Sequence, residues 1–233
     1  MTTFVLVHGG WHGGWCWRRV APLLCERGHD VFTPTLTGLG NRAHLSRPHT
    51  GLAAHVQDVV AVLELDDLRD VVLVGHSSSG VVITGVAQRA AHRIAELVHL
   101  DSFVPAPGDS VFSLLPPERR AFFENLVDAA GRIVLDPDGA MDGWAILDPA
   151  DRAWVGPRLR PHPVGGLADP LPQTPLPELP RRYVHCSIKP TGDSFGGFAA
   201  AAESDPSWRM DTIEAGHDAM VTAPEDLVEL LTH

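Results

Sequence analysis

The 233-residue chain has few cysteines, no long apolar run and no surplus of basic residues, and each absence excludes a class of protein. Its three cysteines, Cys16, Cys25 and Cys186, form no closely spaced pair, which argues against a disulfide framework and a zinc knuckle. No apolar stretch is long enough to span a bilayer, and the N-terminal residues do not resemble a signal peptide. These features predict a soluble, reduced, cytoplasmic protein without a membrane partner.

Basic residues are outnumbered by acidic ones, 18 to 29, so the formal net charge is −11 at pH 7. A field of this sign repels phosphate backbones, and no cluster of lysine or arginine reverses it locally. We therefore expect no nucleic-acid partner. The composition, 44% hydrophobic and 20% charged, predicts a folded chain with a large core.

Strand-like and helix-like segments alternate along most of the chain. "TFVLV", "VVLVGH" and "AELVHL" are apolar runs of strand length, and amphipathic segments such as "LAAHVQDVVAVLELDDL" separate them. This spacing is typical of a mostly parallel central sheet flanked by helices. We expect one α/β core, formed by residues 1–104 and 181–233.

The middle of the chain, residues 105–180, has a different composition. It is rich in proline, as in "PHPVGGLADPLPQTPLPELP", and contains helix-like pieces such as "PPERRAFFENLVDAA". Proline interrupts regular structure and routes a chain around an existing sheet. We expect an inserted helical cap or lid over the edge of the core.

The stretch "VGHSSSG", Val74 to Gly80, follows the third expected strand. A serine flanked at two residues' distance by small residues is forced into a sharp strand-to-helix turn, which exposes its Oγ. Here Gly75 precedes Ser77 by two positions and Ser79 follows it by two. Because serine is larger than glycine, we expect Ser79 to face a gap and Gly80 to supply the remaining room. The alternative is an ordinary polar loop.

Two other features favour a nucleophile at this turn. Gly9 and Gly10, in "HGGWHGGW", can turn backbone N–H groups toward an oxyanion. His217, in "IEAGHDAM", comes after the last expected strand and can activate a serine hydroxyl. The order of glycine-rich loop, serine turn and late histidine fits the catalytic triads of α/β-hydrolases.

The stretches "FVLVHGGWHGGWCW", "VVLVGHSSSG" and "GHDAMVTAPEDL" resemble the α/β-hydrolase superfamily, in the branch that holds plant methyl esterases, hydroxynitrile lyases and bacterial pyrethroid-type hydrolases. The resemblance covers both ends of the chain and is loose over residues 105–180. It implies the α/β-hydrolase fold, Ser77 as nucleophile and His217 as general base. It also implies an oxyanion hole made by the N–H groups of Gly10 and Ser78, and no cofactor.

The third member of the triad departs from the plant pattern, because Lys189 stands where the family's aspartate would align. Two substitutes are available. Asp193 lies four residues further on, in a loop, whereas Asp101 ends a strand in "VHLDSFVP". Orienting an imidazole requires a rigid support, so we expect Asp101 to be the acid and keep Asp193 as the alternative.

The family scaffold also supports other activities. The hydroxynitrile lyases that the chain resembles have a threonine in the oxyanion loop and a lysine after the catalytic histidine, where this chain has Gly9 and Asp218. A carboxylate has the wrong sign to stabilise departing cyanide. A natural-product tailoring enzyme and a ligand-binding receptor with a vestigial triad also stay open.

The substrate pocket is expected to involve Gly9, Trp11, His76, Phe103 and Trp144, under the cap. An apolar pocket of this kind suits a small or medium hydrophobic carboxylic ester or lactone. The histidines form no pair with the spacing of a zinc site, so we expect no metal. A homodimer stays open.

Overall fold

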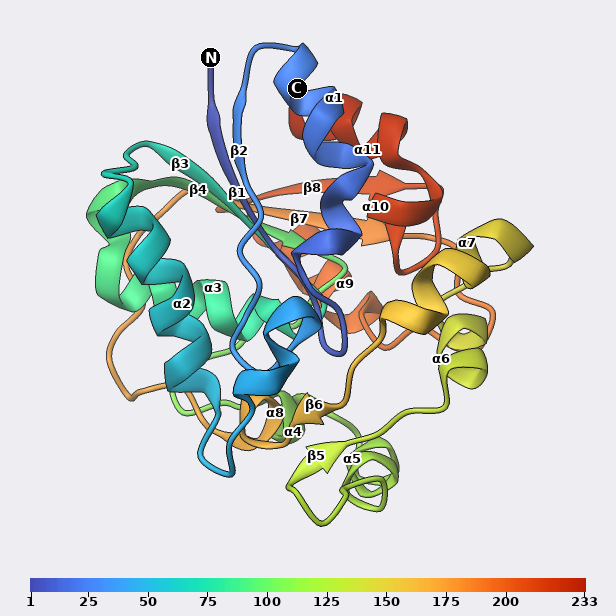
Figure 1. Ribbon diagram of the computed structural model, residues 1–233. Helices are drawn as coiled ribbons and strands as arrows, with labels where there is room; N and C mark the ends of the chain where they lie inside the picture. Colours follow the sequence, from blue (N-terminus) through green and yellow to red (C-terminus); the bar gives the residue numbers. More distant parts are fainter.

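A computed structural model describes all of residues 1–233, and its centre is a six-stranded sheet (Figure 1). Every pairing in this sheet is parallel, in the order β2-β1-β3-β4-β7-β8. The strands are β1 (Thr3–Val7), β2 (Asp30–Phe32), β3 (Val71–His76), β4 (Ile94–Leu100), β7 (Arg181–Cys186) and β8 (Trp208–Ile213). The predicted α/β fold with a parallel central sheet is confirmed.

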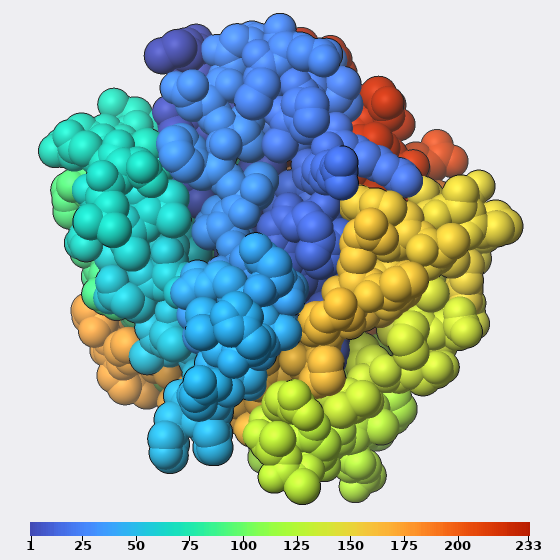
Figure 2. Space-filling model, in the orientation of Figure 1, coloured from blue at the N-terminus to red at the C-terminus, as the bar shows by residue number.

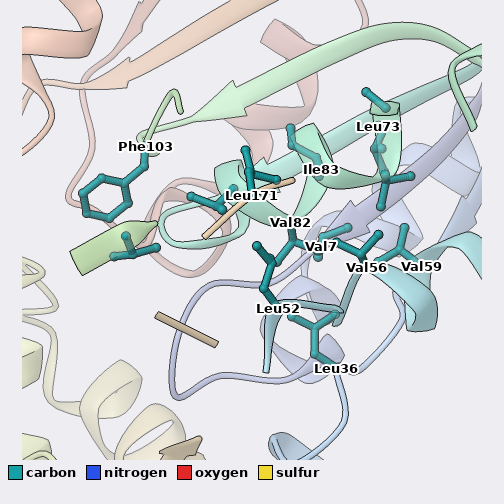
Figure 3. Packing of buried hydrophobic residues seen from close by; sticks show 14 of the residues in the cluster. Val7, Leu36, Leu52, Val56, Val59, Leu73, Val82, Ile83, Phe103 and Leu171 are labelled. Atoms are coloured by element: carbon teal, nitrogen blue, oxygen red, sulfur yellow. The ribbon is translucent and has the colours of Figure 1, made fainter. Parts of the chain in front are cut away.

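Helices cover both faces of the sheet, which explains why the strands β1 and β3 near its centre are almost wholly apolar. Val5 and Val7 of β1 pack toward α2 (Leu52–Leu65) and α3 (Ser79–Ala90), the side drawn in Figure 3. Phe4 and Leu6 alternate with them and pack with α1 (Val20–Glu26) and α11 (Pro224–Leu231) on the other face. A third cluster joins β7 to α9 (Gly196–Ser204).

The segment from β4 to β7 forms a lobe, yellow-green to amber in Figure 2. It holds α4 (Val111–Leu114), α5 (Pro117–Glu124), α6 (Pro137–Gly143), α7 (Pro149–Val155) and α8 (Gly165–Ala168). It also holds an antiparallel pair, β5 (Arg132–Ile133) with β6 (His162–Pro163), which the sequence did not predict. Strands of two residues are too short to show a periodic pattern.

Short helices complete the fold. They are α10 (Ala219–Thr222) and the 3₁₀-helices η1 (Gly14–Arg18), η2 (Gly40–Leu45), η3 (Ala91–Arg93) and η4 (Gly156–Arg158). The stretch "WCWRRVAPLLCERGHD" forms η1 followed by α1, and the chain turns away at Gly28 with φ +83°. None of the helices combines the length and apolar character needed to cross a membrane.

The parallel strands all end at the same edge of the sheet, so the loops that follow them lie together. The glycine-rich stretch follows β1, the serine turn follows β3, and Asp101 follows β4. His217 lies between β8 and α10. Ligands of open α/β sheets bind outside the carboxyl ends of the strands, and this edge is where the candidate residues meet.

Candidate active site

Ser77 lies at the sharp turn between β3 and α3. Its φ is +56°, in the left-handed region that a residue with a side chain rarely adopts. The Ser77 N–H donates to the carbonyl of Leu100 at 3.2 Å, and its own carbonyl accepts from Gly80 and Phe103. The backbone of β4 and the turn itself therefore hold Ser77 in a strained conformation, as a nucleophile elbow requires.

The neighbouring small residues make this turn possible. A Cβ on Gly75 would lie 2.7 Å from the carbonyl oxygen of Ser79, and a Cβ on Gly80 would overlap the carbonyl of Phe103. Ser79 does not face a gap as expected: it is fully buried, and its hydroxyl donates to the carbonyl of His8. The close approach that the second glycine allows in the usual motif is therefore made one residue later, at Gly80.

His217 is held by the carboxylate of Asp101. The Nδ1 atom of His217 lies 2.6 Å from Oδ2 of the fully buried Asp101. The ring of Phe195 stacks on the imidazole at 5.0 Å with an interplanar angle of 6°, and the His217 N–H donates to the carbonyl of Trp144 at 3.0 Å. Because Nδ1 is engaged, Nε2 is the nitrogen available for a reacting hydroxyl.

Asp101 is itself fixed from several sides. It has a φ of +41°, its N–H donates to the carbonyl of Val184 at 2.7 Å, and Oδ1 accepts from the Cys186 N–H at 3.3 Å. Burial alone would raise the pKa of the Asp101 carboxyl, but the hydrogen bond and charge of His217 and the charge of Lys189 hold that pKa below its ordinary value. Asp101 therefore stays ionised.

Lys189 is a component of the site that the sequence did not predict. It is the only lysine of the chain, and its Nζ lies 2.5 Å from the same Oδ2 of Asp101 that binds His217. Its ammonium also lies 5.3 Å from the centre of the Phe195 ring. Two signals were available: Lys189 is the only lysine in the sequence, and it stands where the family's aspartate would align.

Asp193 lies elsewhere. Its Oδ2 accepts from His185 Nε2 at 2.9 Å, and its Oδ1 accepts from the N–H groups of Phe195 and Gly196. It approaches Lys189 at 3.8 Å but makes no hydrogen bond to His217. The structure therefore brings Asp101, and not Asp193, to the imidazole.

A cavity of about 360 Å³ contains the reacting groups. Ser77, Ser78 and His217 line it together with the expected Trp11, Phe103 and Trp144. Val111, Leu115, Phe123 and Leu167 extend its apolar wall, and Lys189, Thr191, Asp193 and Ser194 form a polar end. Glu118 and Arg119 of α5 also line the cavity, so the lobe contributes charged as well as apolar groups, and the β7–α9 loop contributes the polar end.

Gly9 and His76 are not among the lining residues, contrary to expectation. His76 ends β3 with its side chain pointing into the interior, where Nε2 donates to the carbonyl of His217 at 3.0 Å. Gly9 packs directly against it, since a Cβ there would lie 2.8 Å from Nδ1 of His76. Burial lowers the pKa of His76 to about 3, so this ring is neutral.

Two backbone N–H groups beside Ser77 have no acceptor. Gly9 and Gly10 lie against the serine turn, with the Cβ position of Gly10 at 3.5 Å from Oγ of Ser78. The N–H groups of Gly10 and Ser78 lie outside the helices and strands, and neither makes a hydrogen bond. Unpaired donors next to a serine hydroxyl can bind a developing oxyanion.

Comparison with known proteins extends over the whole chain. The model of the alpha/beta hydrolase family matches residues 4–230. A carbendazim hydrolyzing esterase from Nocardioides sp. strain SG-4G is 41% identical over 240 residues, covering 99% of this chain and 98% of that protein. Methylesterase 9 of Arabidopsis thaliana is 37% identical over 106 residues, which cover 45% of this chain and 41% of the plant protein.

A solved structure agrees with this relationship. An extracellular alpha/beta-hydrolase from a Paenibacillus species, which shares structural and functional homology with tobacco salicylic acid binding protein 2, superimposes with a TM-score of 0.89. It is 27% identical, and the match covers 100% of this chain and 98% of that one. The resemblance to plant methylesterases and bacterial esterases is thereby confirmed. The chain belongs to the alpha/beta hydrolase family, as a carboxylic ester hydrolase.

Proposed function

We propose that the chain cleaves its ester through an acyl-enzyme intermediate on Ser77. In this proposal His217 is the general base and acid, and Asp101 orients its ring. The N–H groups of Gly10 and Ser78 form the oxyanion hole. The observation that carries the proposal is the 2.6 Å contact of His217 Nδ1 with Asp101, at a cavity that Ser77 also lines.

The first half of the reaction forms the acyl-enzyme. Ser77 Oγ attacks the carbonyl carbon of the ester while His217 Nε2 accepts the hydroxyl proton. The tetrahedral oxyanion is stabilised by the two free N–H groups, and Asp101 stabilises the imidazolium. When the intermediate collapses, the C–O bond to the alcohol breaks and His217 returns the proton to the leaving oxygen.

The second half releases the acid. Water replaces the alcohol, His217 takes a proton from it, and the hydroxide attacks the Ser77 ester carbon. The second tetrahedral intermediate uses the same oxyanion site. Its collapse returns the proton to Ser77 Oγ and frees the carboxylic acid, so the cycle requires only side chains, backbone N–H groups and water.

The cavity favours a small or medium hydrophobic ester or lactone. Trp11, Phe103, Phe123 and Trp144 provide an apolar wall large enough for one compact, ring-containing group. The relative that acts on carbendazim by name supports a compact substrate of this size. The polar end at Lys189 suits an acceptor oxygen or nitrogen on the substrate.

The decisive experiment is intact-protein mass spectrometry after incubation with a fluorophosphonate. We expect one adduct on the wild type and none on Ser77→Ala, followed by turnover of an ester and lactone panel that Ser77→Ala does not support. An adduct on Ser77→Ala would contradict the choice of nucleophile. A burst of p-nitrophenyl acetate hydrolysis that then stalls would favour a ligand-binding receptor over a turning-over esterase.

A further inference from the structure

Asp218 directly follows His217, and its role was left open by the sequence. It is completely buried and does not line the cavity. Its Oδ2 accepts from Nε2 of His12 at 2.8 Å, and both side chains are fully shielded from solvent. The residue after the catalytic histidine therefore reaches across to the loop that follows β1.

His12 has an acceptor on each ring nitrogen. Nδ1 lies 2.7 Å from the carbonyl oxygen of Gly10, which cannot donate a proton, and Nε2 faces the Asp218 carboxylate. Burial lowers the pKa of His12, but the charge and hydrogen bond of Asp218 and the hydrogen bond to the Gly10 carbonyl together outweigh it, and the net pKa is raised. Burial would raise the pKa of Asp218, yet His12 lowers it to about 2. The pair is an imidazolium and a carboxylate.

His8 holds the preceding peptide. Its Nδ1 donates to the carbonyl of Gly9 at 2.8 Å, and its Nε2 accepts from the Leu36 N–H at 3.1 Å. Burial lowers the pKa of His8 to about 3, so it is neutral and has the tautomer that this arrangement requires. Because a peptide is planar, fixing the Gly9 carbonyl fixes the direction of the Gly10 N–H in the same plane.

We propose that His8 and the His12–Asp218 pair are positioning residues of the oxyanion site: they hold the carbonyls on both sides of the Gly10 N–H and leave that N–H free. This inference rests on the proposed function, which makes the Gly10 N–H an oxyanion donor. Asp218 thus links the histidine loop to the oxyanion loop, so that the base and the donor keep one relative position.

Stability does not account for the pair. Oδ1 of Asp218 is buried without a hydrogen-bond partner, and Nε2 of His76 lies 3.8 Å away, beyond hydrogen-bond distance. A buried ion pair with an unpaired oxygen recovers only part of its desolvation cost, and apolar residues of similar size would be at least as stable. Positioning of the Gly10 carbonyl accounts for its presence.

The test compares two variants with a matched control. His12→Phe removes the hydrogen bonds to Gly10 and Asp218 but keeps a ring between Trp15 and Trp144. The centres of these two rings lie 5.3 and 5.1 Å from the centre of the His12 ring. Asp218→Asn keeps the shape and removes the charge. Asp211→Asn is the control, because Arg182 bridges Asp211 and the Leu230 carbonyl as His12 bridges Asp218 and Gly10, away from the cavity.

The readouts are kcat and KM for a p-nitrophenyl ester and inhibition by a trifluoromethyl ketone, which the serine converts to a tetrahedral oxyanion. The matching methyl ketone binds without forming a tetrahedral adduct with the serine, so it provides the reference for ground-state binding. We expect His12→Phe to lower kcat roughly tenfold, less than the 10²–10³ for losing a donor outright. Asp218→Asn should have a smaller effect in the same direction.

In His12→Phe and Asp218→Asn, affinity for the trifluoromethyl ketone should fall by the same factor as kcat/KM, whereas affinity for the methyl ketone should not change. The activity of the control Asp211→Asn should equal that of the wild type. Wild-type kcat and inhibitor affinity in a folded Asp218→Asn and His12→Phe would overturn the inference. If His12→Phe does not fold, Asp218→Asn decides alone. Retained hydrolysis in Ser77→Ala would instead overturn the proposed function, so the two failures are distinguishable.

Discussion

The site contains two buried aspartate–histidine pairs, Asp101–His217 and Asp218–His12, and they differ in the number of histidine nitrogens that are hydrogen-bonded. His217 has Asp101 on Nδ1 and nothing bonded to Nε2, so it can exchange a proton with a reacting group. His12 has acceptors on both nitrogens, so its protons are fixed. The same two residue types therefore leave one imidazole nitrogen free in one place and engage both nitrogens in the other.

The two pairs also differ in their access to the cavity. The first pair opens on the cavity and shares its carboxylate with Lys189. The second is enclosed between Trp15 and Trp144, with no route to substrate. In the proposed mechanism, a free ring nitrogen together with access to the cavity distinguishes the base His217 from the positioning residue His12.

The largest expected effect comes from breaking the first pair. Asp101→Asn should lower kcat by roughly 10³–10⁴, because an amide stabilises neither the required tautomer nor the imidazolium. Steady-state kinetics with circular dichroism to verify the fold provide the measurement. Asp193→Asn, which leaves His217 untouched, is the control and should stay within about twofold. The opposite ranking would make Asp193 the acid.

Breaking the second pair should affect stability in a pH-dependent way. Asp218 has a lowered pKa of about 2, so its stabilisation is complete above its ordinary 3.8 and is lost as pH falls from 3.8 to 2. His12 has a raised pKa, so its contribution is complete below 6.5 and is lost as pH rises through the raised value. The contribution is therefore largest between about pH 4 and 6.5.

Urea unfolding of the wild type and Asp218→Asn at pH 3, 5.5 and 9 measures this window. We expect the largest difference at pH 5.5, of about 3 kcal/mol, because one partner of a buried pair is lost. His8 and His76 nearby have pKa values of about 3 and stay neutral at the two higher pH values. A difference that does not vary with pH would mean that the folded pair is not ionised.

Lys189→Met sharpens the comparison by removing the cation that only the first pair has. Without it, Oδ2 of Asp101 loses the hydrogen bond from Lys189 and keeps its contact with His217. We expect kcat to fall, by less than in Asp101→Asn, because the carboxylate that faces the imidazole is held less rigidly. Lys189→Arg, which keeps a cation, should stay closer to the wild type in the same steady-state assay. Wild-type kcat in a folded Lys189→Met would show that the triad does not depend on this contact.

The smallest effect is expected from Ser79→Gly, which restores the usual elbow glycine. The variant loses the hydrogen bond to the His8 carbonyl, at a cost of about 1 kcal/mol in the free energy of unfolding. Its kcat/KM should stay within about twofold of the wild type, as measured on the same p-nitrophenyl ester. A loss as large as that of Ser77→Ala would identify Ser79 as the reacting serine.

Much of the fold was predictable because the spacing of apolar residues and the order of strand-like and helix-like segments can be read locally in the sequence. The alternation of Val5 and Val7 with Phe4 and Leu6 between two cores follows from the strand pattern alone. The position of Asp101 at a strand end was also readable, since parallel strands end at one edge.

The unpredicted contacts join residues that are far apart in the chain. His12 meets Asp218 across 206 positions, and Lys189 meets Asp101 across 88. No local pattern encodes such a pairing. The expected position of the His76 side chain was wrong for a related reason. The sequence places His76 next to the candidate nucleophile Ser77, but the pleat of β3 turns its side chain inward, away from the cavity.

The lobe also contacts the core through hydrogen bonds that no sequence pattern predicts. The Trp11 indole donates to the carbonyl of Ile133 at 3.0 Å, and the Trp11 carbonyl accepts from the Arg160 N–H at 2.9 Å. These are backbone groups of the lobe, so side-chain identity carries no signal of them. They show that the glycine-rich loop after β1, which holds the proposed oxyanion donor, is also supported by the lobe.

The single lysine has a practical consequence for handling the protein. Among the side chains of the 233 residues, Lys189 is the only primary amine, and it is 13% exposed and bound to Asp101. Amine-directed labels and resins therefore have one side-chain target, and it lies in the wall of the cavity. A group coupled there would occupy the cavity. Coupling through the thiol of Cys25, which is exposed and does not line the cavity, leaves the cavity open.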